Sequence, residues 1–439
     1  MAAVDAIDGM RATARAMYDA AVAAVEPRAA VAAALTRAGD RLAFAGEHID
    51  LRAIGRVVLI GAGKASAPMA QAVEDVLGEV VADGVVIVKY GHGAPCRRCR
   101  IHEAAHPVPD TAGEDGARAI ERAVAGLGPR DLVVACWSGG ASALMPAPRH
   151  GVTLADKQAT TRLLLASGAT IAEINAVRKH LSRLKGGQLA ALIQPARMLV
   201  LALSDVIGDD PSVIGSGPFT PDGTTYADVA AIVAARGIAE ALPAAVRDLI
   251  ARGVRGEEGE TAKPGDACFQ RVRYAIVGSN ALALDAAAAR ARAVGLTPRV
   301  EAEPILGEAR DAAQRFVERA RALPRGACLI AGGETTVTLG TTPGLGGRAQ
   351  EFALAAALAG AGSDLVVLAA GTDGNDGPTD AAGGMVDATT VARAGALGFD
   401  ARRHLAGHDA NPLLAACGDL VVTGPTRTNV MDVHIALRA

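Results

Sequence analysis

The chain has 439 residues, of which 50% are hydrophobic, 3% aromatic and 21% charged, with a formal net charge of -3. This length exceeds what one hydrophobic core usually holds, so we expect two domains with aliphatic, alanine-rich cores. The slightly acidic balance excludes a general basic surface for nucleic acid or acidic lipid, so the expected partners are small molecules. No apolar run is long enough to span a membrane and the first residues lack a signal-peptide pattern, so we predict a cytoplasmic protein without membrane contact.

The first fifty residues carry apolar side chains at helical spacing and predict at least one long helix. Continuous apolar runs then recur, separated by alanine-rich segments of helix length. This pattern is typical of parallel strands that are buried on both faces. The runs cover residues 57–60, 85–88, 132–136, 198–203, 275–277, 329–331, 365–370 and 420–422. The predicted class is therefore α/β.

A polar, glycine-containing stretch at 252–266 has few side chains to bury. Such composition indicates a linker. We therefore predict an N-terminal domain over 1–255 and a C-terminal region over 265–439.

The first strand run ends in a turn that contains Gly61, Gly63, Lys64 and Ser66. Two glycines let the backbone approach an anion, and the helix that follows presents free N–H groups. The turn is not a Walker A loop, because Val58 stands where that pattern needs glycine, and Ser66 replaces the third glycine of the dinucleotide fingerprint. A lysine at a helix start opposes the helix dipole, which favours an anionic ligand over a merely solvated side chain.

Two further turns after strand runs offer the same arrangement without a cation. One holds Ser138, Gly139, Gly140 and Ser142, and the other runs from Gly278 to Asn280. Both are candidates for nucleotide binding, since ligands of open parallel sheets lie beyond the carboxyl ends of the strands. The alternative for each is an ordinary tight strand-to-helix turn.

Carboxylates gather in the segment 371–380, which contains Asp373, Asp376 and Asp380, and Asp205 follows another strand run. Phosphoryl transfer needs Mg²⁺ held by oxygen ligands and an acceptor for the substrate proton. Both could come from these side chains, although Asp and Asn are also ordinary turn residues.

Cations appear in two settings. Arg348 ends a glycine run, and its planar fork matches phosphate or carboxylate, with a surface arginine as the alternative. The stretch 175–188 is rich in Lys and Arg. A solvated helix face explains it most simply, but a face that points into a cleft would hold an acid substrate.

A zinc site has less support. Cys96 and Cys99 lie near three histidines but lack a second cysteine pair, and no metalloprotease spacing or Gly-x-Ser-x-Gly elbow occurs.

Taken together, the motifs resemble, in their order and over nearly the whole chain, the glycerate 2-kinase family, whose C-terminal part is the MOFRL domain. The matching segments are 60–66, 106–110, 138–142, 174–182 and 203–209 in the first half, and 331–337, 346–351, 371–383 and 423–430 in the second.

The resemblance implies a larger Rossmann-like domain and a smaller MOFRL domain at about 325–435, with catalysis in the cleft between them. It implies that ATP and Mg²⁺ convert D-glycerate to 2-phosphoglycerate, that Lys64 and Arg348 match the family's catalytic cations, and it leaves a homodimer open. The expected site comprises Lys64, Arg348 and Asp373 for catalysis; Gly61, Gly63, Ser66, Ser138, Gly139, Gly140, Ser142, Asp205, Gly278 and Asn280 for nucleotide binding; and Asp205, Asp376 and Asp380 for the metal.

Two alternatives remain at this point. Members of the family are also labelled hydroxypyruvate reductases, which would use NAD(P)H, but the incomplete dinucleotide fingerprint argues against that activity. A non-catalytic module that binds sugar phosphates would explain the glycine turns but not the acidic segment.

Overall fold

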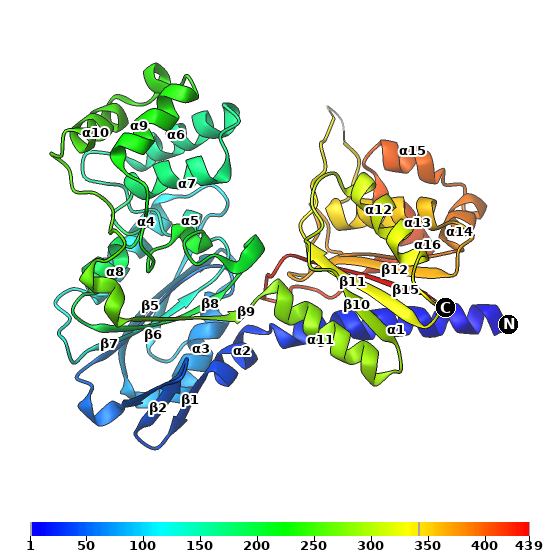
Figure 1. Ribbon diagram of the computed structural model, residues 1–439, viewed down its shortest axis with the longest axis horizontal. Coiled ribbons are helices and arrows are strands. Elements are labelled where there is room, and N and C mark those ends of the chain that lie inside the picture. The colour runs from blue at the N-terminus through cyan, green and yellow to red at the C-terminus, as the bar shows by residue number, and fades with distance from the viewer. Residues whose placement is uncertain (1, 341–342, 439) are drawn as a thin grey trace. The chain divides into compact units, whose positions relative to one another are not determined.

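The computed structural model describes residues 2–340 and 343–438 (Figure 1). The chain divides into two compact units. The large unit is Pro27–Val277, and the terminal unit combines the residues up to Glu26 with those from Gly278 onward. The units therefore do not follow the predicted ranges 1–255 and 265–439.

The segment predicted as a linker lies inside the large unit, because its polar groups are bonded there. The hydroxyl of Thr261 donates to Asp222 at 3.0 Å, and Glu260 accepts the backbone N–H of Tyr226 at 2.9 Å. Low hydrophobicity in this segment therefore marks a hydrogen-bonded loop and not a free connection.

The large unit is built on a six-stranded sheet in the order β6-β5-β4-β7-β8-β9. The pairs from β6 to β8 are all parallel. A small antiparallel sheet, β1-β2-β3, precedes it. The elements of the unit are α2 (Pro27–Ala34), β1 (Leu35–Ala38), β2 (Arg41–Phe44), β3 (Glu47–Asp50), β4 (Val57–Ala62), α3 (Ser66–Leu77), β5 (Val81–Lys89), β6 (Cys99–Ala104), α4 (Thr111–Ala123), β7 (Leu132–Trp137), α5 (Ala141–Leu144), α6 (Leu154–Ala166), α7 (Ile171–His180), α8 (Gln188–Ile193), β8 (Arg197–Leu203), α9 (Tyr226–Ala235), α10 (Ala244–Val254) and β9 (Val272–Gly278).

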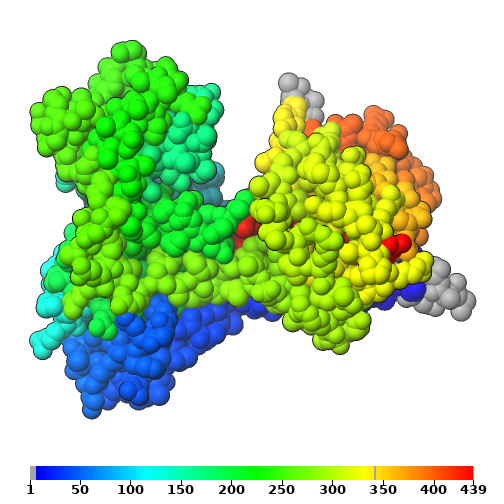
Figure 2. Space-filling view, viewed as in Figure 1, coloured from blue at the N-terminus to red at the C-terminus, as the bar shows by residue number. Residues whose placement is uncertain are grey.

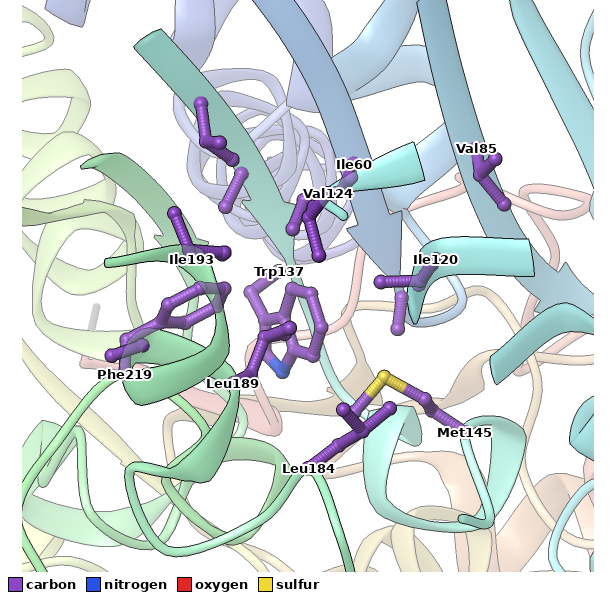
Figure 3. Close-up of a cluster of buried hydrophobic side chains, with 14 of the residues drawn as sticks. Ile60, Val85, Ile120, Val124, Trp137, Met145, Leu184, Leu189, Ile193 and Phe219 are labelled. Carbon is purple, nitrogen blue, oxygen red and sulfur yellow. The ribbon is translucent and has the colours of Figure 1, made fainter. Parts of the chain in front are cut away.

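One core of the large unit surrounds Trp137, the last residue of β7 (Figure 3). Its indole meets Phe219 edge to face, with ring centroids 5.0 Å apart. Ile120 of α4 and Leu189 of α8 pack from the helical side. Trp137 is the one tryptophan of the chain. It fills the volume at the end of β7, just before the turn that begins at Ser138.

A second core joins α6, α7, α9 and α10 through residues such as Leu164, Val177, Val229 and Leu249. These helices form the green group that carries no strand in Figure 1, and its outer surface is visible in Figure 2.

The terminal unit contains a mixed six-stranded sheet in the order β10-β11-β15-β12-β13-β14. Only β10 and β11 pair in parallel, whereas β15 lies antiparallel to both β11 and β12. The elements are α1 (Ala2–Ala24), α11 (Asn280–Ala293), β10 (Thr297–Val300), α12 (Ala309–Arg321), β11 (Ala327–Gly333), α13 (Arg348–Gly360), β12 (Leu365–Gly371), β13 (Gly383–Asp387), α14 (Thr390–Ala396), α15 (Ala401–Ala406), α16 (Ala410–Cys417), β14 (Leu420–Val421) and β15 (Asp432–Arg438).

The α/β class with a Rossmann-like parallel sheet and a second α/β part is confirmed. The expectation of parallel pairing was wrong for 365–370 and 420–422, because β12 pairs antiparallel with both neighbours and β13 with β14. Strand β15, from the end of the chain, inserts between β11 and β12 and sets this direction. None of the helices in the described ranges combines the length and apolar composition needed to cross a membrane.

His434 of β15 is fully buried against Phe352 of α13, with ring centroids 4.4 Å apart. Burial lowers the pKa of His434 to about 4, below its ordinary value of 6.5. The unfolded chain therefore binds a proton that the folded chain excludes, and folding stability falls as the pH drops from 6.5 toward 4. We expect His434→Phe to flatten this dependence by up to about 3 kcal/mol, measured by urea unfolding at several pH values. Equal slopes in parent and variant would contradict the assignment.

Candidate functional site

The strand order of the large unit creates a switch point. Numbered from β4, the order reads 3-2-1-4-5-6, as in doubly wound dinucleotide-binding folds, and the direction of winding reverses between β4 and β7. In such sheets the ligand lies beyond the carboxyl ends of the two strands at the reversal. The turns after β4 and β7 are the ones that contain Lys64 and Gly139.

Glycines allow these two turns to pack together. A Cβ built on Gly61 would lie 2.9 Å from the carbonyl oxygen of Cys136. Gly63 has φ +135°, and a Cβ there would lie 2.1 Å from Oγ of Ser138. No other residue type fits at Gly63, so this glycine serves the close approach of the turns.

Hydrogen bonds then fix one turn on the other. The N–H of Lys64 donates to the carbonyl of Gly139 at 2.9 Å, and the N–H of Ala65 donates to Oγ of Ser138 at 3.0 Å. The hydroxyls of Ser66 and Ser138 are 3.2 Å apart. Both serines thus hold the turns in place, and their predicted contact with nucleotide remains a prediction.

The backbone of the second turn keeps free donors. Within the described residues, the N–H groups of Gly139 and Gly140 make no hydrogen bond. Glycine turns with outward N–H groups are suited to bind the oxygens of a phosphate.

The half-buried side chain of Lys64 lies beside these donors. Its ammonium forms no ion pair with any described residue, and its Cγ would lie 3.5 Å from a Cβ on Gly140. His106 is the other neighbour, and a Cβ on Gly140 would lie 3.0 Å from its ring. Burial and then the charge of Lys64 lower the pKa of His106 to about 4, so the imidazole is neutral at pH 7. His106 therefore adds no charge at pH 7, and Lys64 is the cation that these turns offer to an anion.

Asp205 brings a carboxylate to the same turns from the end of β8. Its Oδ2 would lie 2.0 Å from a Cβ on Gly139. Burial raises the pKa of Asp205, and the nearby Lys64 acts in the opposite direction. Asp205 has no ion-pair partner in the described chain, so its oxygens are available to a divalent cation that accompanies a phosphate.

A short polar chain continues from Ser142. Its hydroxyl lies 2.9 Å from that of Ser216, which donates to Oδ1 of Asn175 at 3.3 Å. The structure thus adds three residues that our predicted site omitted: His106, Asn175 and Ser216. The first two lie in segments that resemble the family, whereas Ser216 comes from a loop whose approach to α5 only the fold reveals.

In the terminal unit, Arg348 opens α13 and is held by carboxylates. Its Nε and Nη2 donate to Asp432 at 2.7 and 2.9 Å, and its Nη1 lies 2.8 Å from Glu334. Asp432, whose side chain is 1% exposed, raises the pKa of Arg348. We did not predict Asp432 from the sequence, where it begins a strand that has no long apolar run.

The three carboxylates of the acidic segment 371–380 lie in different environments. Asp373 is half-buried and accepts the N–H of Asn375 at 3.1 Å, whereas Asp380 is exposed. Asp376 is buried and accepts the N–H groups of Ala349 and Gln350 at 3.1 and 2.8 Å. Asp376 thereby caps α13, whose own preceding residue, a glycine, provides no side-chain cap.

This cap gives a prediction with a matched control. Burial raises the pKa of Asp376 to about 6, so the carboxylate is ionised at pH 8. We expect Asp376→Ala to lower the free energy of unfolding by about 1 to 2 kcal/mol at pH 8. The exposed Asp380→Ala should change it by less than about 0.5 kcal/mol, as measured by urea unfolding. Equal stabilities of the two variants would contradict the capping role.

The third predicted turn belongs to the start of α11. The amide of Asn280 donates to the carbonyls of Val430 and Asp432 at 2.8 and 3.1 Å, and Ser279 caps the helix. Gly278 ends β9. These contacts tie α11 to the end of the chain, and nucleotide binding by Gly278 and Asn280 remains a prediction.

No group of three or more His, Cys, Asp or Glu side chains within residues 2–340 and 343–438 is arranged to hold a metal ion on its own. Asp205 belongs to the large unit, whereas Asp376 and Asp380 belong to the terminal unit. The predicted metal set therefore stays a prediction.

Comparison with known proteins gives the family. A family model described as a domain of unknown function (DUF4147) matches residues 13–251, and the MOFRL family model matches 327–432. The D-glycerate 2-kinase of Thermotoga maritima is 40% identical over 394 residues, which cover 88% of this chain and 91% of that protein. The chain belongs to the glycerate 2-kinase family.

A second relative of this chain is named for a different activity. A protein of Agrobacterium vitis named "Putative hydroxypyruvate reductase" is 45% identical over 433 residues, covering 96% of this chain and 93% of that protein. The crystal structure of glycerate kinase from Thermotoga maritima matches with a TM-score of 0.87 and 36% identity, covering 98% of this chain and all of that one. The chain is thus an enzyme of the glycerate 2-kinase family, and the similarity covers nearly its whole length.

Proposed function

We propose that the protein transfers the γ-phosphoryl group of ATP to the 2-hydroxyl of D-glycerate and releases 2-phosphoglycerate and ADP. The observation that carries the proposal is the ammonium of Lys64, which has no ion-pair partner among the described residues, beside the N–H groups of Gly139 and Gly140, which form no hydrogen bond there, at the switch point of the parallel sheet. Donors and a cation placed in this way stabilise the charge that spreads over a transferring phosphoryl group.

The roles follow from the environment of each side chain. Lys64 stabilises the phosphoryl oxygens, and Asp205 is the carboxylate suited to the Mg²⁺ that accompanies ATP. The oxygen at C2 of glycerate attacks the γ-phosphorus, the bond to the β-phosphate oxygen breaks, and the hydroxyl proton passes to a carboxylate. Asp373 and Asp205 are the candidates for this proton, because both oxygens of Asp376 already accept N–H groups of α13. Arg348 is the second catalytic cation of the proposal.

The reductase activity has weaker support. In dinucleotide folds the third fingerprint position is glycine or alanine and an acidic residue follows the second strand. Here Ser66 occupies the third position with its hydroxyl against Ser138, and β5 ends at Lys89 instead of an acidic residue. Neither feature favours NADH.

An assay with purified protein separates the two activities. ADP release is followed with D-glycerate, ATP and Mg²⁺, and nicotinamide oxidation is followed in parallel with hydroxypyruvate and NADH or NADPH. The proposal expects Mg²⁺-dependent ADP release that requires glycerate. Oxidation of NADH or NADPH without ADP release would support the reductase activity instead.

The proposal includes ATP as the phosphoryl donor, Mg²⁺ as the cofactor that accompanies it, and a cytoplasmic location, where ATP is supplied and the six free cysteines stay reduced. A homodimer is the remaining prediction about partners, and light scattering of the purified chain tests it.

A further inference from the structure

Three cationic side chains gather in the large unit after the Gly140 turn. This cationic cluster consists of Lys157 on α6, Arg178 on α7 and Lys185 in the turn before α8. Lys157 and Lys185 are 8% and 2% exposed, while Arg178 is partly exposed. They are close enough that Arg178 lowers the pKa of both lysines by charge repulsion, in addition to the larger effect of burial.

The cluster has no counter-charge of its own. Lys185 donates to the carbonyl of Met145 at 3.2 Å, and Lys157 donates to the carbonyl of Leu181 at 3.2 Å. Arg178 makes neither a hydrogen bond nor an ion pair in the part of the chain that the structure describes. Glu114 favours the charged form of Lys157 but forms an ion pair with Arg118. The lowered pKa lets the two lysines lose their charge, whereas the guanidinium of Arg178 stays charged. Partly buried charges are normally paired, so Arg178 is the group of this cluster that is suited to an anion from outside the chain.

The cluster adjoins the turn of Lys64 through α5. The residue before α5, Gly140, lies against Lys64, and the residue after it, Met145, accepts the ammonium of Lys185. A helix of these four residues is only about 6 Å long. The polar chain from Ser142 reaches Asn175, which lies three residues before Arg178 on the same face of α7.

We propose that Arg178 binds the carboxylate of the acid substrate, with the buried Lys185 and Lys157 beside it. This inference rests on the proposed function and names the residue that selects an acid over a neutral polyol. Arg178 is the member of the cluster with an exposed face, and its planar fork pairs with a carboxylate through two parallel hydrogen bonds. Phosphoryl transfer then takes place at the Lys64 end of α5.

The test compares Arg178→Gln with a control, Arg162→Gln, which replaces an exposed arginine of α6 that makes no ion pair with any described residue. Initial rates are measured at saturating ATP with D-glycerate and with its neutral amide, D-glyceramide. We expect the KM for D-glycerate to rise about 10- to 100-fold in Arg178→Gln. The KM for ATP and the kcat/KM for D-glyceramide should stay within twofold, and Arg162→Gln should match the parent.

Two results would overturn the inference. One is an unchanged KM for D-glycerate, and the other is an equal loss toward D-glycerate and D-glyceramide, which indicates a structural role. Arg178→Lys keeps the charge without the fork, so an intermediate KM in a variant with parental thermal stability supports carboxylate recognition even if Arg178→Gln folds poorly.

Calorimetric titration of D-glycerate without nucleotide separates this inference from the proposed function. If the parent binds D-glycerate but does not phosphorylate it, and Arg178→Gln does not bind it, the carboxylate site stands and the kinase proposal fails. If the parent phosphorylates D-glycerate and Arg178→Gln still binds it with parental affinity, the inference about Arg178 fails alone.

Discussion

Replacing Lys64 by alanine is expected to lower kcat by on the order of 10²-fold or more, because a preorganised cation at the transferring phosphoryl group is lost. The turn itself should persist, since it is fixed by backbone bonds to Gly139 and by the hydroxyl of Ser138. Steady-state kinetics with D-glycerate and ATP measure the effect. Thermal unfolding is expected to remain close to that of the parent.

The surface variant Arg162→Ala is the control for the loss of one cation, and its turnover should equal that of the parent. A second readout comes from His106, whose pKa is lowered first by burial and then by Lys64. Its pKa, followed by NMR, should rise above about 4 in Lys64→Ala. Turnover within a fewfold of the parent would remove Lys64 from the mechanism.

The second large effect is expected for Arg348→Ala, which should lose both stability and activity. The side chain of Asp432 is 1% exposed and would be left as an unpaired buried charge, which costs about 3 kcal/mol. Loss of the proposed contact with the phosphoryl group should lower kcat by on the order of 10²-fold. Urea unfolding and steady-state kinetics measure the two effects separately.

The double variant Arg348→Ala with Asp432→Asn distinguishes structure from catalysis. Removing the charge of Asp432 should restore much of the stability, because no buried carboxylate then lacks its partner. Turnover should remain low. Recovery of activity together with stability would show that Arg348 acts only by holding Asp432.

The fold could be predicted where the residues of a single strand or helix form a recognisable sequence pattern. Seven of the eight apolar runs lie wholly in strands, because strands buried on both faces must be apolar throughout, and the run 420–422 extends one residue beyond β14. Strand β6, at the edge of its sheet, was missed because Arg100, His102 and Glu103 interrupt its apolar residues. Strand β15 was also missed, although it is central, because Asp432 and His434 interrupt its apolar pattern. Its antiparallel insertion depends on a pairing of distant segments that no local pattern encodes.

The site residues also divide into those with a local sequence pattern and those that depend on contacts between distant segments. Gly63 and Lys64 could be found because a glycine turn after a strand has a specific local chemistry. The capping role of Asp376 and the pairing of Arg348 with Asp432 depend on contacts between segments 27 and 84 residues apart. In the sequence, Arg178 is one cation in a basic helix. Only its lack of a partner within residues 2–340 and 343–438 and its position relative to Lys185 distinguish it from a solvated side chain.

Phosphorus NMR after incubation of the purified protein with D-glycerate, ATP and Mg²⁺ identifies the product. We expect a phosphorus resonance coupled to the proton at C2, as in 2-phosphoglycerate, and its absence when Lys64 is replaced by alanine. A phosphate coupled to the protons at C3, or unchanged glycerate together with oxidation of NADH or NADPH by hydroxypyruvate, would contradict the proposed activity.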